Sequence, residues 1–139
     1  MIAFLDCDEI VKCRKILQHN GRVCILLDYM NLESLTNLVS SERRNFTEKS
    51  CKYILYKIAQ GLHKMHSYQV LHRDVKSENI LINDEGDIKI ADLGMSVFLC
   101  DEKKFRETRR GTINCISPEI VNGSQYTSEI DVWAYGVLA

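Results

Sequence analysis

The hydrophobic pattern of the first forty residues predicts a strand pair followed by a short helix. Residues 22–30 form an apolar, β-favouring run, and the turn sequence His19-Asn20-Gly21 stands directly before it. The other strand of this hairpin is predicted near Ile10 to Leu17. From Asn31 to Leu38, leucines recur at a three-residue spacing, which favours a short amphipathic helix.

A second, longer helix is predicted to begin at Thr47-x-x-Ser50, with Thr47 or a neighbour as its N-cap. Its apolar stripe follows helical spacing and comprises Cys51, Ile54, Leu55, Ile58, Leu62 and Met65. Short strands are predicted at 70–71, 79–83 and 88–91, with a turn at Asp84-Glu85-Gly86-Asp87 between the last two. Residues 92–119 show neither the two-residue period of a strand nor the 3.6-residue period of a helix, as expected of a mobile regulatory segment. An apolar helix is predicted to follow near Ser128.

Composition bounds the kind of protein. The 139 residues suffice for one compact domain, which would bury roughly two-thirds of the surface of the unfolded chain. A formal net charge of −1 indicates no polyanion-binding surface, so nucleic acid is not an expected partner. No apolar run reaches the roughly 18 residues of a membrane span, and the N-terminus lacks the features of a secretory signal. We therefore expect a soluble, intracellular, cytoplasmic protein without a membrane span.

The six cysteines are scattered, with no Cys-x-x-Cys pair and no histidine at metal-ligand spacing. This argues against a zinc site. Reduced thiols fit a chain without a secretory signal. A disulfide framework is the weaker alternative, because the apolar content can supply a core.

The strongest chemical signal is the pattern His-Arg-Asp-x-Lys-x-x-Asn at residues 72–79, followed by Asp92-Leu93-Gly94. Five fixed positions would arise by chance in a given window about once in a few million, taking roughly one in twenty per residue type. Phosphoryl transfer needs an acceptor hydroxyl and a polyphosphate held in line while metal ions neutralise charge. Asp74 can accept the hydroxyl proton, Lys76 can offset negative charge, and Asn79 and Asp92 supply hard oxygen ligands for Mg²⁺.

This order and spacing resemble the catalytic loop and metal-binding motif of the eukaryotic protein kinases. The resemblance implies an α+β, protein-kinase-like fold, truncated to the end of the small lobe (two strands and the hinge) and the first, mainly helical half of the large lobe. In the partial kinase domain 1–139, about 1–30 would be the small-lobe remnant and hinge, and 31–139 the large-lobe portion. The catalytic loop would occupy 72–79 and the activation segment 92–119. ATP and Mg²⁺ are the implied cofactors.

A second block, Gly111-Thr112-Ile113-Asn114-Cys115-Ile116-Ser117-Pro118-Glu119, is similar to the end of a kinase activation segment, with Ser117 in place of the usual Ala. By resemblance, Thr112 packs near Asp74 and Lys76 and joins the catalytic group. Glu119 would be a structural residue that pairs with an Arg much further along a kinase domain.

Three other residues have structural roles by resemblance. Asp131 is similar to the Asp of the kinase Asp-x-Trp-x-x-Gly pattern, which accepts hydrogen bonds from catalytic-loop backbone, although alone it would be interpreted as an N-cap. His72 and Leu93 would belong to a packed hydrophobic spine and do no chemistry. Leu93 stands where most kinases have Phe and should pack at a cost of order 1 kcal/mol or less.

Two residues are regulatory candidates. Arg73 is expected to meet a phosphorylated residue of the activation segment. Thr108, three residues before Gly111, stands where kinases of MAP-kinase cascades often carry an activating phosphothreonine. A solvated loop threonine is an equal interpretation. In the regulatory one, an upstream activating kinase modifies Thr108 and the phosphate pairs with Arg73.

The resemblance assigns adenine recognition to backbone groups at Asp28 and Met30, with Leu27 as gatekeeper, Leu81 beneath the base and Ser34 near the ribose. The nucleotide-contacting positions it implies are Asp28, Met30, Ser34, Lys76, Glu78, Asn79, Leu81 and Asp92. Lys76 and Gly111-Thr112 point to serine/threonine specificity and so to protein substrates bearing Ser or Thr. The narrower resemblance is to MAP-kinase-cascade and sterile-group kinases.

The sequence lacks several parts of a complete kinase domain. No Gly-rich strand-turn-strand, no Val-Ala-x-Lys strand and no partner Glu precede Val23, and the match spans about half of a domain of roughly 250 residues. We expect the chain alone to have very low activity, marginal stability and exposed apolar surface on the helix near Ser128. Three interpretations stay open: a serine/threonine kinase fragment or truncated product, a catalytically dead interaction module, and an incomplete gene model.

Overall fold

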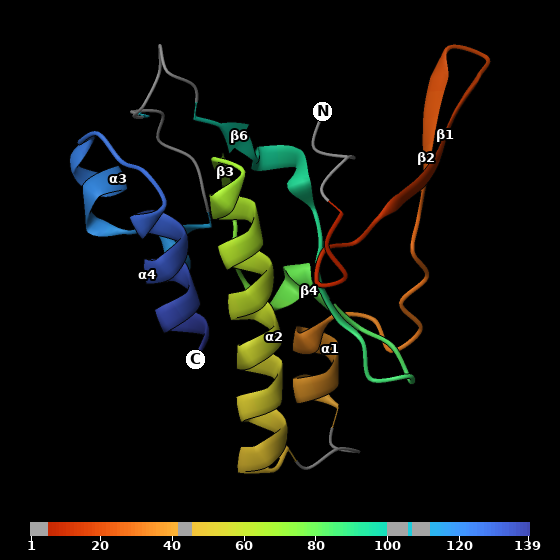
Figure 1. Cartoon of the computed structure of the whole chain (residues 1–139), viewed down its shortest axis with the longest axis horizontal. Coiled ribbons are helices and arrows are strands. Elements are labelled where there is room, and N and C mark those ends of the chain that lie inside the picture. The colour runs from red at the N-terminus through yellow and green to blue at the C-terminus, as the bar shows by residue number, and fades with distance from the viewer. Residues whose placement is uncertain (1–5, 42–45, 100–105, 107–111) are drawn as a thin grey trace.

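The computed structural model describes residues 6–41, 46–99, 106 and 112–139. Its elements are β1 (Cys13–His19), β2 (Arg22–Leu27), α1 (Leu35–Ser40), α2 (Glu48–Ser67), β3 (Val70–Leu71), β4 (Ile80–Ile82), β5 (Ile88–Ile90), β6 (Val97–Phe98), α3 (Pro118–Asn122) and α4 (Glu129–Leu138). Single 3-10 turns lie at Ser77–Asn79, Leu93–Met95 and Ile113–Cys115. The described strands pair antiparallel as β1–β2, β3–β6 and β4–β5, and the long helix α2 lies between α4 and the β1–β2 hairpin (Figure 1). The predicted α+β fold class is confirmed.

The main core forms where α2 packs on the β4–β5 hairpin. Thr47 caps α2 as predicted, since its hydroxyl accepts a hydrogen bond from the Ser50 N–H at 3.1 Å. The core combines α1, α2, the catalytic loop, β4–β5 and α4 through Leu35, Leu38, Ile54, Ile58, Leu62, Val75, Ile80, Ile82, Ile88, Ile90 and Ala134. Cys51, expected in the buried stripe, is exposed, because it lies in the first turn of α2 at the outer end of the buried line.

The first strand lies later than predicted. Ile10 and Val11 are buried and pair with β5: the Val11 N–H donates to the Ile90 carbonyl at 2.9 Å, and Ile90 forms a parallel bridge with Ile10. The hairpin strand β1 therefore begins only at Cys13. Its turn matches the prediction, because Asn20 and Gly21 both have positive φ angles, of 49° and 72°.

The helix predicted over 31–38 begins later as well. The Ser34 hydroxyl caps α1 by accepting from the Asn37 N–H at 3.3 Å. Leu32 lies before the helix, and its N–H donates to the Ile82 carbonyl of β4 at 3.1 Å. The segment between β2 and α1 is therefore attached to the β4–β5 hairpin.

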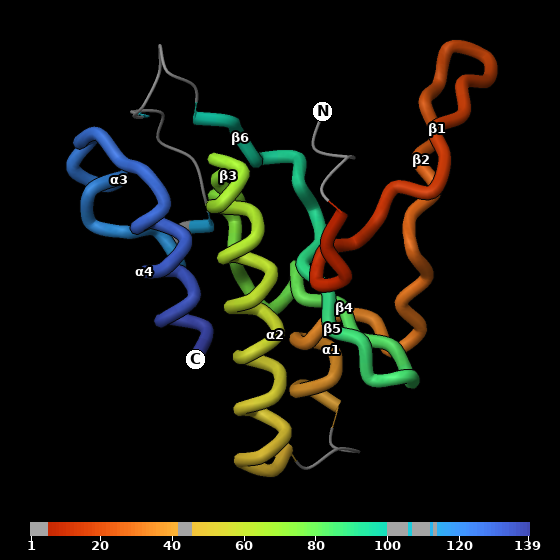
Figure 2. Tube along the Cα trace, viewed as in Figure 1, coloured from red at the N-terminus to blue at the C-terminus, as the bar shows by residue number. Residues whose placement is uncertain are grey.

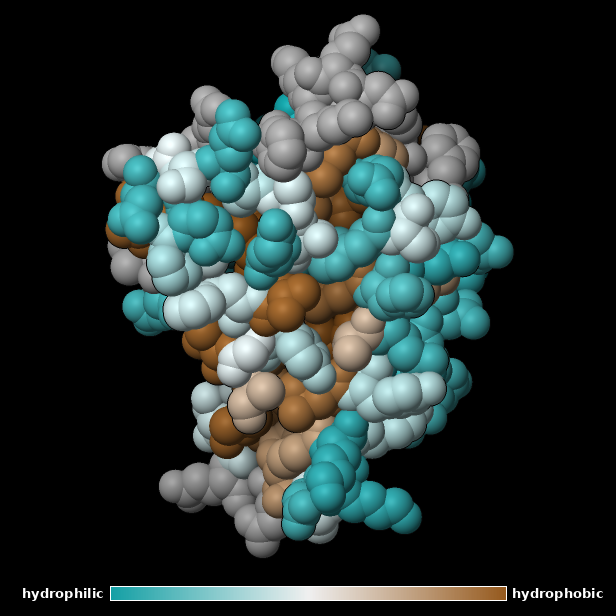
Figure 3. All heavy atoms as spheres, turned by 60° about the vertical axis from the view of Figure 1, so that its left-hand side comes forward, coloured by the Kyte–Doolittle hydropathy of each residue, from teal (hydrophilic) through white to brown (hydrophobic). Residues whose placement is uncertain are grey.

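Two surfaces leave large apolar side chains exposed. The β1–β2 hairpin projects away from the other elements (Figures 1 and 2) and exposes Ile16, Val23, Ile25 and Leu27. Helix α4 exposes Val132, Trp133 and Val137, and hydrophobic residues form a band on the face that Figure 3 brings forward. None of the helices in the described ranges combines the length and apolar character that crossing a membrane requires.

Candidate active site

The loop at 72–79 joins β3 to β4 and is held from beneath by one buried carboxylate. Asp131 of α4 is 1% exposed and accepts hydrogen bonds from the backbone N–H groups of His72 and Arg73, each at 2.8 Å. Arg73 has a φ of 69°, a left-handed conformation that a non-glycine residue keeps only when its surroundings enforce it. Asp131 supplies that enforcement. His66, in the last turn of α2, contacts the same carboxylate through Nε2 at 2.8 Å.

His72 is fully buried and links the loop to the strand that leads to Asp92. Its Nε2 donates to the Ala91 carbonyl at 3.0 Å, and its Nδ1 accepts from the Asp74 N–H at 3.2 Å. A carbonyl can only accept and a backbone N–H can only donate, so these two bonds assign the neutral tautomer. Burial also lowers the pKa of His72, which keeps the ring uncharged.

The Asp74 carboxylate is surrounded by three side chains from the predicted site, those of Lys76, Asn79 and Thr112. The Thr112 hydroxyl donates to Asp74 Oδ1 at 2.6 Å, and Lys76 Nζ lies 2.8 Å from Asp74 Oδ2. Asn79 Nδ2 donates to Asp74 Oδ2 at 3.1 Å and to the Asp74 carbonyl at 2.8 Å. Lys76 Nζ also donates to the Thr112 hydroxyl at 2.8 Å. The four side chains therefore form one closed network.

This network fixes the charge of Asp74. Burial alone would raise the pKa of the carboxyl group, but hydrogen bonds from Lys76, Thr112 and Asn79 outweigh it and hold the pKa below its ordinary value. The pKa of Lys76 is raised, chiefly by its hydrogen bond to Asp74. At neutral pH the structure therefore presents an ionised carboxylate beside a protonated amine.

Asn79 and Asp92 are brought together by the pairing of β4 with β5. The Ala91 N–H donates to the Asn79 carbonyl at 2.8 Å, which places the residue before Asp92 alongside Asn79. Asn79 uses its amide nitrogen on Asp74, leaving the amide oxygen for a cation. Asp92 has a φ of 57°, and its Oδ1 accepts from the Gly94 N–H at 3.2 Å. One amide oxygen and one exposed carboxylate are a donor set that fits Mg²⁺.

Comparisons with known proteins agree with this geometry. The family model described as "Protein kinase domain" matches residues 1–139. The chain belongs to the protein kinase family. Ribosomal protein S6 kinase alpha-1 of Mus musculus is 37% identical over 129 residues, which are 93% of this chain and 18% of that protein. NUAK family SNF1-like kinase 2 of Homo sapiens is 35% identical over 139 residues, covering 99% of this chain and 22% of that protein.

Mitogen-activated protein kinase kinase 1c of Physcomitrium patens is 33% identical over 133 residues, which are 95% of this chain and 38% of that protein. The chain thus spans less than two-fifths of the length of these relatives. They bear names from several kinase groups, so the narrower resemblance to MAP-kinase-cascade kinases stays a prediction.

The positions predicted to contact the adenine and ribose lie on β4 and in the hinge, the segment between β2 and α1. Met30 is buried, and Ser34 forms an antiparallel bridge with Leu81, so the structure brings these two residues together. The Ser34 hydroxyl is used as the α1 cap, a contact that the sequence interpretation did not include. The Asp28 N–H donates to the Lys12 carbonyl at 3.1 Å, which leaves the Asp28 carbonyl and the Met30 N–H as candidate groups for a base. Leu27 is half exposed at the end of β2.

Of the two regulatory candidates, the structure describes Arg73. Thr108 lies outside the described residues. Arg73 donates from Nε to the Met95 carbonyl at 2.7 Å and from Nη1 to the Tyr126 hydroxyl at 3.2 Å. Sequence reasoning missed Tyr126, which is buried although it stands in a polar, irregular stretch. Its signal was weak, because one aromatic residue between helices has no periodicity.

The remaining predicted residues lie in three places. Leu93 packs against a cluster of Cys7, Ile10, Met65 and Val70. Glu119 is half buried in the first turn of α3, and Glu78 is exposed at the edge of the catalytic loop. Sequence reasoning also missed His66, which contacts Asp131 and not the loop itself. The only signal in the sequence was its position in the last turn of α2, shortly before the loop.

Proposed function

We propose that this chain carries the catalytic machinery of a serine/threonine protein kinase, which transfers the γ-phosphoryl group of ATP to Ser or Thr hydroxyl groups of proteins. The observation that carries the proposal is the closed network of Asp74, Lys76, Asn79 and Thr112. It presents an oriented carboxylate whose lowered pKa keeps it ionised and ready to accept a proton.

Asp74 is the proposed proton acceptor. The acceptor hydroxyl would place its proton on the Asp74 carboxylate as its oxygen bonds to the γ-phosphorus of ATP. The bond from that phosphorus to the β–γ bridging oxygen would break, and ADP would leave. Thr112 and Asn79 hold the carboxylate in one orientation. Lys76 supplies a fixed positive charge beside the site of transfer. Mg²⁺, when bound, would neutralise charge on the phosphates, with Asn79 and Asp92 as its protein ligands.

A cleft of about 450 Å³ adjoins this network and is a candidate site for the protein substrate. Its lining comes from α1, the catalytic loop, the 112–115 turn and the end of α4, through Leu35, Thr36, Val39, Ser40, Lys76, Ser77, Glu78, Thr112, Asn114, Cys115, Val137 and Leu138. Lys76 and Thr112 face both the cleft and Asp74, so an acceptor side chain entering here would lie next to the proton acceptor. An upstream kinase acting on Thr108 remains part of the proposal.

Nucleotide binding tests the proposal. The unfolding temperature of the purified protein is measured with and without Mg²⁺ and ATP, for wild type and Asp92→Asn. At a ligand concentration about 100 times the Kd, binding stabilises the folded state by about 2.7 kcal/mol, and the shift should depend on Mg²⁺. Asp92→Asn should remove it, because the proposed metal ligand loses its charge.

The matched control is Asp84→Asn, the same chemical change at an exposed aspartate of the β4–β5 turn. It should keep the wild-type shift. A wild-type protein that is not stabilised by Mg²⁺ and ATP would contradict the proposal and favour a kinase-like interaction module. An equal shift in Asp92→Asn would contradict the assignment of Asp92.

A further inference from the structure

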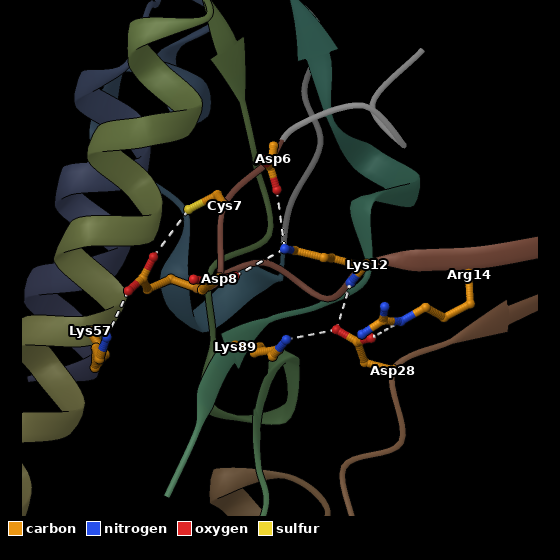
Figure 4. Close-up of polar contacts among 9 residues, drawn as sticks. Asp6, Cys7, Asp8, Lys12, Arg14, Asp28, Lys57 and Lys89 are labelled. Carbon is orange, nitrogen blue, oxygen red and sulfur yellow. Dashed lines mark hydrogen bonds and ion pairs between the residues drawn. The ribbon is translucent and has the colours of Figure 1, made fainter.

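The Asp28 carboxylate, directly after β2, is buried and receives three donors. Its side chain is 6% exposed. Lys89 Nζ of β5 lies 2.7 Å from Oδ2, and the Lys12 N–H donates to the same oxygen at 3.1 Å. Arg14 Nε of β1 donates to Oδ1 at 2.5 Å. Figure 4 shows the three donors converging on this carboxylate from two segments of the chain, residues 12–14 and β5.

The partners of this carboxylate favour its charged form. Burial would raise the pKa of Asp28, but the hydrogen bonds from Lys89, the Lys12 backbone and Arg14 lower it to about 2. Lys89 is itself 10% exposed, so neither member of the pair is screened by water as a surface ion pair would be. The contact is therefore specific in geometry and sensitive to removal of either charge.

Asp28 joins the hinge, where the proposed function places the adenine, to β5, which leads to the proposed metal ligand Asp92. Asp28 opens the hinge, whose other end is attached to β4 by the Leu32 N–H to the Ile82 carbonyl at 3.1 Å and the Ile82 N–H to the Glu33 carbonyl at 3.0 Å. Lys89 lies on β5, the strand that leads to Asp92. The β4–β5 hairpin therefore anchors the hinge at both of its ends.

We infer that Asp28 is a positioning residue, whose carboxylate fixes the hinge backbone to β5 so that the adenine-contacting groups and the metal ligand Asp92 keep one spacing. The inference rests on the proposed function, because the hinge and Asp92 are nucleotide contacts only if that proposal holds. The side chain of Asp28, and not only its backbone, thereby positions the hinge, with Lys89 and Arg14 as its partners.

The test compares Asp28→Asn, Lys89→Met, their double variant and Arg14→Ala in steady-state phosphoryl transfer. Asp28→Asn and Lys89→Met should each raise the KM for ATP about tenfold, the loss expected of one charge-assisted hydrogen bond, with kcat within about twofold. The KM of the double variant should be no higher than that of the poorer single variant, because both substitutions remove the same Asp28–Lys89 ion pair. Arg14→Ala is the mild variant that will fold, since its side chain is largely exposed, and should raise KM about two- to threefold.

A second measurement follows the hinge itself without nucleotide. Hydrogen–deuterium exchange of the peptide covering residues 28–33 should be faster in Asp28→Asn than in wild type. The matched control is Lys57→Met, which breaks the 2.7 Å ion pair between Lys57 of α2 and Glu9, another partly buried pair in the same region (Figure 4). It should reduce stability while leaving the KM for ATP and the exchange of 28–33 unchanged.

The inference is overturned if Asp28→Asn and Lys89→Met match Lys57→Met in both KM and hinge exchange. A wild-type protein that binds no ATP would instead overturn the proposed function. In that event the exchange of residues 28–33 still decides whether Asp28 fixes the hinge.

Discussion

The catalytic loop and the β1–β2 hairpin contain similar apolar residues, but the loop region buries them and the hairpin exposes them. Ile80, where the loop enters β4, is completely buried, whereas Ile25 of β2 is 58% exposed. The loop is braced by Asp131 of α4 and by Ala91, the residue after β5, while His66 of α2 contacts Asp131. The hairpin is held mainly by its own ladder and by the contacts at Asp28. The proposed catalytic residues therefore lie in the catalytic loop, the better stabilised of these two regions.

An isolated two-stranded hairpin is at best marginally stable in water, and this one gains little from burial. Its pairing from Cys13–Leu27 to His19–Arg22 is satisfied within the two strands. Burial of apolar side chains normally offsets the entropy that strands lose on folding, but here these side chains are in contact with solvent. We therefore expect the hairpin to be less stable than the catalytic loop.

Replacing Asp131 should have the largest effect on the braced region. Asp131→Ala leaves the N–H groups of His72 and Arg73 buried without their acceptor and should lower the free energy of unfolding by roughly 3 to 5 kcal/mol. Urea denaturation measures this loss. Asp131→Asn, which keeps an acceptor oxygen, should cost less, and equal losses for the two variants would show that the hydrogen bonds are not the cause.

The same substitution in the two regions gives the next largest contrast. Ile80→Ala should cost about 2 to 5 kcal/mol, because it opens a cavity in the core, whereas Ile25→Ala should cost less than about 1 kcal/mol. Thermal or urea unfolding of both variants provides the comparison. Similar losses would mean that the hairpin is covered in solution.

Acid should weaken the link between the hairpin and β5. Asp28 has a folded pKa of about 2 against its ordinary value of 3.8, so its stabilising contribution is complete above about pH 4 and is lost as pH falls through about 2. The shift corresponds to about 2 kcal/mol. Stability measured against pH should show this loss in wild type and lack it in Asp28→Asn; a parallel decline in both proteins would remove Asp28 from the explanation.

The smallest effect is expected on the hairpin surface. Val23→Thr exchanges one β-branched side chain for another at an exposed position and should change stability by less than about 0.5 kcal/mol while reducing aggregation in light scattering. Val75→Thr, at a buried position of the loop, is the matched control and should cost about 1 to 3 kcal/mol. Equal costs would erase the distinction between the regions.

Much of the braced region follows from sequence patterns. Thr47 and the spacing of Ile54, Ile58 and Leu62 predicted α2, because a cap and a helical period are local properties. The motif placed Asp74, Lys76 and Asn79 in one loop, and they are in contact. The boundaries of the first strand were wrong, because Ile10 and Val11 pair with β5, a partner distant in sequence.

The contacts that hold the site were harder to predict. His66, Tyr126 and Lys89 each reach a site residue from another element, and no motif joins them to it. Asp28 was predicted from its backbone, while its carboxylate proves to be the centre of an ion network. Such pairings depend on how elements pack, which a local pattern does not encode.

Transfer of labelled γ-phosphoryl from ATP to peptides that differ only in a Ser, Thr or Tyr acceptor tests the central assignment most directly. It compares the natural full-length protein with its Asp74→Asn and Asp84→Asn variants in the presence of Mg²⁺. Wild type and Asp84→Asn should label the Ser and Thr peptides, and Asp74→Asn should lower the rate about 10²- to 10⁴-fold. An Asp74→Asn protein that transfers phosphate at the wild-type rate, or a wild-type protein that transfers none, would contradict it.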